Sequence, residues 1–102
     1  MNEIELRVGE EQTIVINDFT IAFHFNPFDR EWLMDLTNPD GELVAANIAM
    51  RPNTWPLKSM DGRMGWPRLT VIDKEPDSEV PLNPFTDFGD RLGVFEMVGD
   101  LV

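Results

Sequence analysis

The sequence predicts an all-β fold, a small antiparallel β-barrel or sandwich of about six or seven short strands with two long ordered loops. Three observations lead to this prediction. Short segments in which apolar and polar residues alternate recur along the chain, and this is the period of a half-buried strand. The connections between these segments are rich in Pro and Gly. Two of the connections have residues that nearly dictate a tight turn between antiparallel strands.

The stretch from Thr20 to Val44 predicts three consecutive antiparallel strands joined by two turns. Residues Thr20–Asn26 alternate Ile, Phe and Phe with Thr, Ala and His, and Glu31–Thr37 places Trp, Met and Leu on one face. Asn26–Asp29 (NPFD) offers Asn to open a turn and Pro to preset φ at its second position. Asn38–Gly41 (NPDG) fits a type I turn followed by a left-handed Gly. This stretch indicates an architecture, and none of its residues has an evident chemical task.

Two strands are expected before this meander. Glu3–Val8 alternates apolar and charged residues, as a clean amphipathic strand does. Gln12–Asn17 supplies a second strand, with Ile14 and Ile16 directed inward. Asp18-Phe19 is then expected to link the second strand to the meander.

Three further segments are candidate strands. Glu42–Met50 fits either a strand with a bulge or a short helix, and we favour the strand because every preceding connection is a hairpin. Arg68–Asp73 and Arg91–Val98 have clearer strand patterns. The last of these offers three residues to the core: Leu92, Val94 and Phe95.

Two segments are predicted to be long ordered loops. Met50–Pro67 holds three prolines and two glycines, which argues against a central strand or a long helix. It is also rich in Trp and Met, so we expect it to pack on something rather than to be disordered, with a mini-hairpin at Asp61-Gly62 as one option. Lys74–Asp90 is acidic and contains Pro. Its expected anchors in the core are Val80, Leu82, Phe85 and Phe88.

Length and charge bound the class of protein. At 102 residues and 11.7 kDa, we expect a single β domain over residues 1–102. Nineteen Asp and Glu against eight Lys and Arg give a formal net charge of −11 and a pI near 4.2. Such a surface repels nucleic acid phosphates and anionic lipids, so we expect neither stable nucleic acid binding nor a membrane partner.

Other absences in the sequence narrow the class further. There is no Cys, and therefore no disulfide, thiolate nucleophile or Cys-based zinc site. No apolar run approaches the roughly 20 residues that span a bilayer. The N-terminus is acidic where a signal peptide is basic, which favours intracellular synthesis.

The sequence offers little to an enzyme. The only histidine, His24, lies mid-strand and opposite to its Phe neighbours, which favours a solvent-facing or hydrogen-bonded structural role. Ser59 and Ser78 are outside any G-x-S-x-G elbow. Gly62–Gly65 lacks the strand and helix that would flank a phosphate loop. We therefore expect no enzyme activity, no catalytic residues and no cofactor.

One acidic segment invites comparison with a metal site. Asp73–Glu79 carries an acid at every second position, as oxygen-rich Ca²⁺ loops do. It lacks the turn Gly and the terminal Glu of an EF-hand, and Pro76 interrupts it. A solvated acidic loop without a bound metal is the preferred interpretation.

Cations concentrate in the first long loop and predict a partner-binding surface. Between Met50 and Arg68 there are four Lys or Arg against a single acid, Asp61. A basic loop with Trp and Met on an acidic domain suits contact with another protein, including a copy of itself. The candidate partner-binding residues are Arg51, Trp55, Lys58, Met60, Arg63, Met64, Trp66 and Arg68.

The three tryptophans have different expected places. Trp32 alternates in register with other core residues, so the core is its default position. Trp55 and Trp66 each precede a Pro, which favours extended backbone. Either of these two folds back as a lid over one end of the barrel or projects into a partner, and both alternatives stay open.

A series of short motifs resembles a known family through its order and spacing. The motifs are Gln12-Thr13, Phe23–Asn26 (FHFN), Trp32–Leu36 (WLMDL), Asp40-Gly41, Leu43–Ala45 (LVA), Gly65–Asp73 and Asp87–Leu92 (DFGDRL). Together they span nearly the whole chain and resemble the small baseplate plug proteins of contractile-tailed bacteriophages.

The resemblance implies a function that composition alone does not. Members are non-enzymatic virion proteins at the centre of the tail baseplate, where they pack against the tail hub and help to close the tube lumen before contraction. It further implies assembly in the host cytoplasm. The implied partners are other baseplate proteins (tail hub, spike and tube-initiating proteins) and copies of the chain itself.

Two other classes of function compete with this one. An acidic inhibitor that mimics DNA fits the composition, although a mimic needs an unbroken negative stripe and the four cations of the first long loop interrupt it. A small β-module that binds an oligosaccharide or Ca²⁺ is the second alternative. It requires stabilisation of the chain by its ligand.

Overall fold

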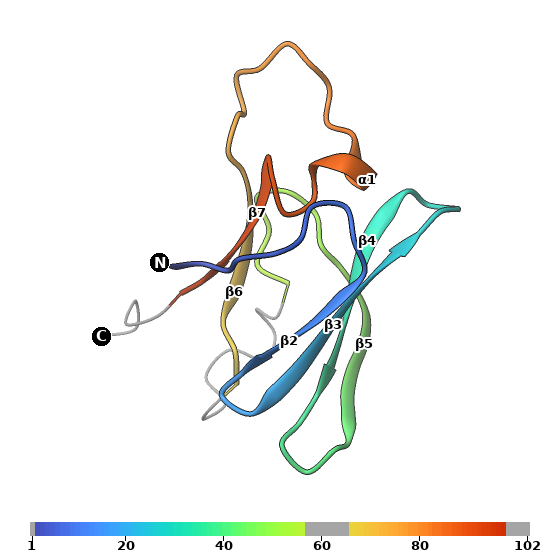
Figure 1. The fold of residues 1–102 in the computed structure, drawn as a ribbon, viewed down its shortest axis with the longest axis vertical. Helices are drawn as coiled ribbons and strands as arrows, with labels where there is room; N and C mark the ends of the chain where they lie inside the picture. The colour runs from blue at the N-terminus through green and yellow to red at the C-terminus, as the bar shows by residue number, and fades with distance from the viewer. Residues whose placement is uncertain (1, 57–65, 98–102) are drawn as a thin grey trace.

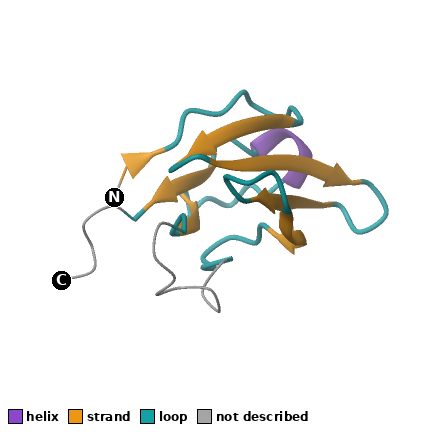
Figure 2. Ribbon diagram, turned by 90° about the horizontal axis from the view of Figure 1, so that it is seen from below, coloured by secondary structure: helices purple, strands orange, loops and turns teal. Residues whose placement is uncertain are grey.

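The structure is a computed structural model that describes residues 2–56 and 66–97. These residues form two antiparallel sheets that face each other, with one short helix (Figures 1 and 2). The elements are β1 (Asn2–Glu3), β2 (Gln12–Ile16), β3 (Phe19–Asn26), β4 (Glu31–Thr37), β5 (Leu43–Ala49), β6 (Leu69–Asp73), α1 (Pro84–Asp87) and β7 (Leu92–Glu96). The all-β prediction is confirmed, and of its two forms the molecule adopts the sandwich rather than a closed barrel. In the described ranges, no helix has the length and apolar character to cross a bilayer.

The larger sheet has the strand order β2-β3-β4-β5, so it is a meander in sequence order. The predicted strand Glu31–Thr37 is confirmed as β4. The strand interpretation of Glu42–Met50 is also confirmed, although this strand runs from Leu43 to Ala49 and pairs with β4 in irregular register. The predicted link at Asp18-Phe19 is wrong, because the turn is Asn17-Asp18 with φ of 52° and 67°. Left-handed conformation at both central residues matches the twist of a two-residue hairpin, and Phe19 is thereby freed to begin β3.

The two predicted turns of the meander form as expected. Asn26 accepts a hydrogen bond from the Phe28 N–H (3.0 Å), which opens the first turn. In the second, the Asn38 side-chain oxygen accepts from the N–H groups of Asp40 and Glu42 (3.1 and 2.9 Å), and Gly41 has a φ of +86°. Side chain and backbone thus cooperate to set the register of both hairpins.

Gly41→Ala should lower the free energy of unfolding by about 1–2 kcal/mol, because only the backbone conformation opposes the new methyl group. A Cβ at this position would meet nothing within 4 Å, so no steric clash adds to the strain. Urea unfolding of the two proteins measures the difference. Gly41→Asn, which tolerates the left-handed region better, is the matched control and should lose less. Equal losses for Ala and Asn would contradict this explanation.

The prediction of a strand over Glu3–Val8 is wrong for most of its length. Only Asn2 and Glu3 pair with β7, and one more backbone bond joins the Ile4 N–H to the Val94 oxygen (2.9 Å). The following residues leave the smaller sheet and cross to the larger one, so they cannot continue either ladder. Alternation survives in part, because Ile4 and Leu6 pack against the core while Val8 is exposed.

The core lies between the sheets and is built from the inner faces of β3, β4, β6 and β7. Its buried apolar residues are Phe19, Ile21, Phe23, Trp32, Met34, Leu36, Met50, Leu69, Val71, Phe88, Leu92 and Val94. Trp32 is confirmed as a core residue, and its ring stacks on Phe88 with centroids 4.4 Å apart. Met50, expected where a strand meets the first long loop, follows directly after β5 and is only 4% exposed, so its side chain belongs to the core.

The segment between β6 and β7 is ordered but differs in detail from expectation. Phe88 is buried and Leu82 packs on the core, whereas Val80 is 68% exposed and Phe85 is 49% exposed. The Phe85 ring still contacts Phe25 edge-on, with centroids 5.2 Å apart. One helical turn, α1, was not predicted; Asn83 caps it by accepting from the Phe85 N–H (3.1 Å).

A buried ion pair between Arg91 and Asp73 holds the segment between β6 and β7 in place. Arg91 donates from Nε to Asp73 Oδ1 (2.8 Å) and from Nη2 to Asp73 Oδ2 (3.2 Å), and both side chains are only 9% exposed. Its remaining donors reach the backbone oxygens of Val80 (2.6 Å) and Glu75 (3.0 Å). Asp73 is therefore committed to a structural role within the acidic segment that was compared with a Ca²⁺ loop.

Candidate interaction surface

The predicted partner-binding residues fall into two groups. Lys58, Met60, Arg63 and Met64 lie outside the described residues, as do Ser59 and the Asp61-Gly62 mini-hairpin. The other four, Arg51, Trp55, Trp66 and Arg68, are described. They come from the segment after β5 and from the residues just before β6.

Trp55 and Arg68 are brought together beside β6. The Asn53 N–H donates to the Val71 oxygen (2.6 Å), and the Val71 N–H donates to the Thr54 oxygen (3.0 Å). This short antiparallel pairing holds Trp55 alongside the strand that Arg68 leads into. The Arg68 guanidinium carbon lies 5.0 Å from the centroid of the Trp55 ring, a cation–π contact worth about 0.5–1 kcal/mol at a partly exposed site.

The indole nitrogen of Trp55 is buried and has no hydrogen-bond partner among the described residues. A buried donor without an acceptor costs about 1–3 kcal/mol. Such groups are rare in folded proteins and call for an explanation in each case. The Trp55 ring is in contact with Arg68, and its indole N–H has no acceptor among the described residues.

Arg51 contacts the start of β4. Its Nε donates to Glu31 Oε1 (2.6 Å), and this bond raises the pKa of the Arg51 guanidinium above its usual value. The side chain is 66% exposed, so the pair contributes little to stability. Arg51 also lines a mostly apolar cavity of about 210 Å³. The other residues around this cavity are Arg30, Glu31, Trp32, Met50, Pro52, Leu82, Pro84 and Leu92.

Trp66 folds back onto the molecule. Its ring centroid lies 5.3 Å from that of Phe19, at an interplanar angle of 55°, and the side chain packs against the core. Of the two alternatives for this residue, the structure shows the inward one. Its ring covers the core where β3 begins.

His24 and the acidic residues were the candidates for catalysis or metal binding in the sequence. His24 Nε2 lies 3.3 Å from Asp35 Oδ1 across neighbouring strands, and both side chains are about one third exposed. The hydrogen-bonded role expected for His24 is confirmed. In the part of the chain that the structure describes, no three His, Cys, Asp or Glu side chains gather as metal ligands do.

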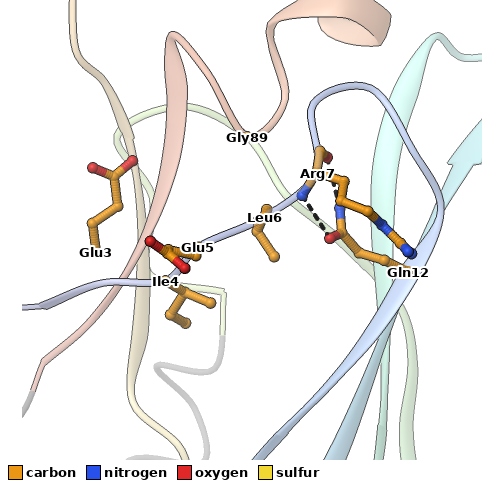
Figure 3. A pocket seen from close by; sticks show the side chains of 7 residues that line it. All are labelled: Glu3, Ile4, Glu5, Leu6, Arg7, Gln12 and Gly89. Atoms are coloured by element: carbon orange, nitrogen blue, oxygen red, sulfur yellow. Dashed lines mark hydrogen bonds between the residues drawn. The ribbon is translucent and has the colours of Figure 1, made fainter.

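An open cleft of about 700 Å³ lies along the N-terminal segment, and the sequence did not indicate it. We call it the N-terminal cleft. Its lining residues are Glu3, Ile4, Glu5, Leu6, Arg7, Gln12 and Gly89 (Figure 3). The alternating pattern of residues 3–8 suggested a full strand, and only a break in that strand leaves this space. No local signal in the sequence marks this break, which comes directly after Glu3, whereas the left-handed Gly9 (φ of 65°) lies six residues later.

Gln12, the first residue of β2, lines the N-terminal cleft and is bonded to Arg7 on the segment opposite. Its side-chain oxygen accepts from the Arg7 N–H, and its side-chain N–H donates to the Arg7 oxygen, both at 2.8 Å (Figure 3). The amide thus pairs with Arg7 as another peptide unit would. Arg7 itself is ion-paired to Glu10 (2.9 Å), and Glu3 to Lys74 (2.7 Å).

Comparison with known protein families identifies the chain. The model of the cyanophage baseplate Pam3 plug gp18 family matches residues 1–98. The chain belongs to this baseplate plug family. The resemblance to baseplate plug proteins is thereby confirmed. No curated protein matches the chain.

The motifs that carried the resemblance are mostly architectural in this family member. Phe23–Asn26 and Trp32–Leu36 supply the inner faces of β3 and β4, and Asp40-Gly41 forms the turn that follows. Leu43–Ala45 begins β5, and Asp87–Leu92 holds Phe88 and Arg91. In this chain these residues serve mainly to build the two sheets and the core.

Proposed function

We propose that this chain is a non-enzymatic structural subunit at the centre of a phage tail baseplate. In this role it packs against the tail hub and neighbouring spike and tube-initiating proteins, and helps to close the tube lumen before contraction. The observation that carries the proposal is the match of the baseplate plug family to residues 1–98. A two-sheet β-sandwich is compatible with such a role.

The charge of the chain supports a position near the path of DNA. With a net charge of −11, its surface repels a passing polyanion rather than retaining it. A plug that must leave the lumen clear when DNA exits benefits from this repulsion. The same charge favours neighbours that present cations.

The alternative of an inhibitor that mimics DNA receives no support from the arrangement of acids. Several acidic side chains are neutralised locally, which interrupts the negative surface. The exposed ion pairs are Arg7–Glu10, Arg51–Glu31 and Lys74–Glu3. A mimic needs an unbroken series of acids, so the structural role is the better proposal.

Trp55 and Arg68 are the described residues that we propose for partner contact. Trp and Arg are the types most enriched at binding hot spots. Trp55→Ala should weaken binding to the baseplate partner by about 2 kcal/mol, about thirtyfold in Kd. Titration calorimetry with the purified hub protein measures this change, and thermal unfolding checks that the variant is folded. Val80→Ala, which truncates an exposed side chain on a different loop, is the control and should bind normally.

Deleting the gene in the phage that carries it tests the proposed function. We expect particles with incomplete or unclosed tails and a loss of infectivity, restored by wild-type protein supplied in the host. Complete and infectious particles assembled without the chain would overturn the proposal. Negative-stain electron microscopy of the purified particles distinguishes the two outcomes.

A further inference from the structure

The hydrogen-bonding pattern of β2 leaves one side of this strand open. A two-residue turn joins β2 to β3, and the pair Ile16–Phe19 closes it. The closing pair of such a turn exchanges backbone bonds, and bonded and non-bonded pairs then alternate along the ladder. The N–H and C=O groups of Thr13 and Val15 therefore point away from β3. Within the described ranges, no other backbone group pairs with them.

The other strand edges are protected in ways that β2 is not. The outer edge of β6 pairs with Thr54 through Val71. β5 has an irregular register and a left-handed residue, Asn47, and β1 is two residues long. These are devices by which proteins prevent a sheet from growing at its edge. Gln12–Ile16 is regular and contains no Pro, Gly or Lys.

The side chains of β2 suit an added strand. Ile14 and Ile16 pack against the core, while Thr13 and Val15 lie on the outer face. Val15 is 66% exposed, so a neighbour on that face would cover apolar surface. Gln12, the first residue of the strand, also lines the N-terminal cleft, which leaves space beside the start of this edge (Figure 3).

The residues around this edge are mostly acidic, which favours a partner that carries Lys or Arg. Glu5 and Asp18 flank the strand in sequence, and in the described structure neither of them forms an ion pair. The nearer acid Glu11 is directed the other way, because its carboxylate accepts from the Phe25 N–H of β3 (3.0 Å). Arg7 is the only Lys or Arg in the first 29 residues, and Glu10 already neutralises it. A segment that approaches the edge therefore meets uncompensated negative charge.

We propose that the open edge of β2, Gln12–Ile16, pairs with an extended segment of a neighbouring baseplate subunit that carries Lys or Arg. The segment adds a strand to the larger sheet, with its backbone bonded to Thr13 and Val15 and its cations beside the flanking acids. Two copies of β2 placed edge to edge would bring the same acids together, which favours a different protein as the occupant. The proposal rests on the structural role proposed above, because it names one contact that this role requires.

Amide hydrogen exchange of the full chain, read by NMR, tests the proposal with a defined probe. In the free protein, the Thr13 and Val15 amides should exchange quickly and the Ile14 and Ile16 amides slowly. A short capped peptide of alternating Lys and Val, at about ten times its Kd, should slow exchange at Thr13 and Val15 about tenfold. Unchanged exchange at these two amides, or slowing at β5 instead, would overturn the proposal.

Matched probes and variants separate strand addition from general attraction. A peptide with Glu in place of Lys should protect neither the Thr13 nor the Val15 amide from exchange. If it protected them as well as the Lys peptide does, the preference of the edge for a basic partner would be refuted. Val15→Pro removes one outward N–H and should abolish binding, whereas Val15→Thr keeps the edge and should bind. An N-methylated Lys peptide, lacking alternate donors, should also fail against wild-type protein, so the test does not depend on the folding of the Pro variant.

Two further readouts distinguish this proposal from its alternatives. Analytical ultracentrifugation at low salt should show a monomer. A dimer that the Val15→Pro substitution dissociates would show that a second copy of the chain occupies the edge, and this would contradict the proposal. The peptide experiment uses the isolated protein, while the deletion experiment uses phage particles. If the peptide does not protect β2 but deletion of the gene does disrupt the tails, only the proposed pairing at the open edge of β2 is rejected. If the peptide protects β2 but particles without the chain are complete and infectious, only the proposed place in the baseplate is rejected.

Discussion

Trp32→Ala should lower the free energy of unfolding by about 3–5 kcal/mol, the range for removing a fully packed aromatic residue. The Trp32 side chain is 2% exposed, and its ring stacks almost parallel to Phe88, at an interplanar angle of 13°. Its Nε1 donates to the Pro84 oxygen (2.6 Å). One side chain thus joins the larger sheet to the segment that carries α1, and urea unfolding followed by circular dichroism measures its contribution.

A second substitution separates the ring from its hydrogen bond. Trp32→Phe keeps most of the stacking area but leaves the Pro84 oxygen without its donor, so the expected loss is about 1–3 kcal/mol. Val80→Ala, at an exposed position, should change stability by less than about 0.5 kcal/mol. A Trp32→Ala protein as stable as the Val80→Ala control would contradict the assignment of Trp32 to the core.

Arg91→Met should cause the second large loss of stability, because it leaves the Asp73 carboxylate in a confined site without its counter-charge. It also removes the donors to the Val80 and Glu75 oxygens, so the segment from 74 to 83 should become accessible to protease. Asp73→Asn and the double variant complete a mutant cycle. Because the two side chains share their bonds, the double variant should lose clearly less than the sum of the single losses. Additive losses would contradict a direct coupling.

The same pair should make stability depend on pH in the acid range. The hydrogen bond from Arg91 is the main cause that lowers the pKa of Asp73 below its ordinary value of 3.8. A carboxyl whose pKa is depressed by folding contributes stability above its unfolded pKa and loses it as pH falls through the folded one. Wild-type protein should therefore lose stability below pH 3.8 more steeply than Asp73→Asn. Parallel pH profiles of the urea midpoint would contradict this.

The features that the sequence predicted well depend on local interactions. The alternation in β3 and β4 survives in the structure because one face of each strand meets the core along its whole length. The Asn38–Gly41 turn forms because Asn38 and Gly41 satisfy its backbone requirements within a few residues. For the same reason β3 and β4 pair in regular register on either side of their turn, whereas β5 pairs with β4 in irregular register.

The features that the sequence missed depend on contacts between distant segments. The break after Glu3 arises because the chain must pass from one sheet to the other, which no local pattern records. Met50 enters the core because β5 delivers it beside Trp32, whose oxygen accepts from the Met50 N–H (2.8 Å). The α1 turn is tied to Trp32 by the hydrogen bond from the Trp32 Nε1 to the Pro84 oxygen, 52 residues further along the chain.

The residues of the candidate surface were selected from the sequence, and the structure describes four of them. Residue types alone selected Trp55 and Arg68, and the structure brings them into contact through the pairing of Thr54 with Val71. Trp66 was chosen by the same reasoning but packs on the core, because a Trp in a loop can cover apolar surface as readily as it can project. The open edge of β2 could not be selected from composition, since it is defined by which backbone groups lack a partner.

Quantitative mass spectrometry of purified phage particles, separated into heads, tubes and baseplates, tests the structural role most directly. We expect the chain in the baseplate fraction, in a fixed ratio to the other baseplate subunits and absent from heads. Its absence from particles, despite abundant synthesis in infected cells, would contradict a place in the baseplate.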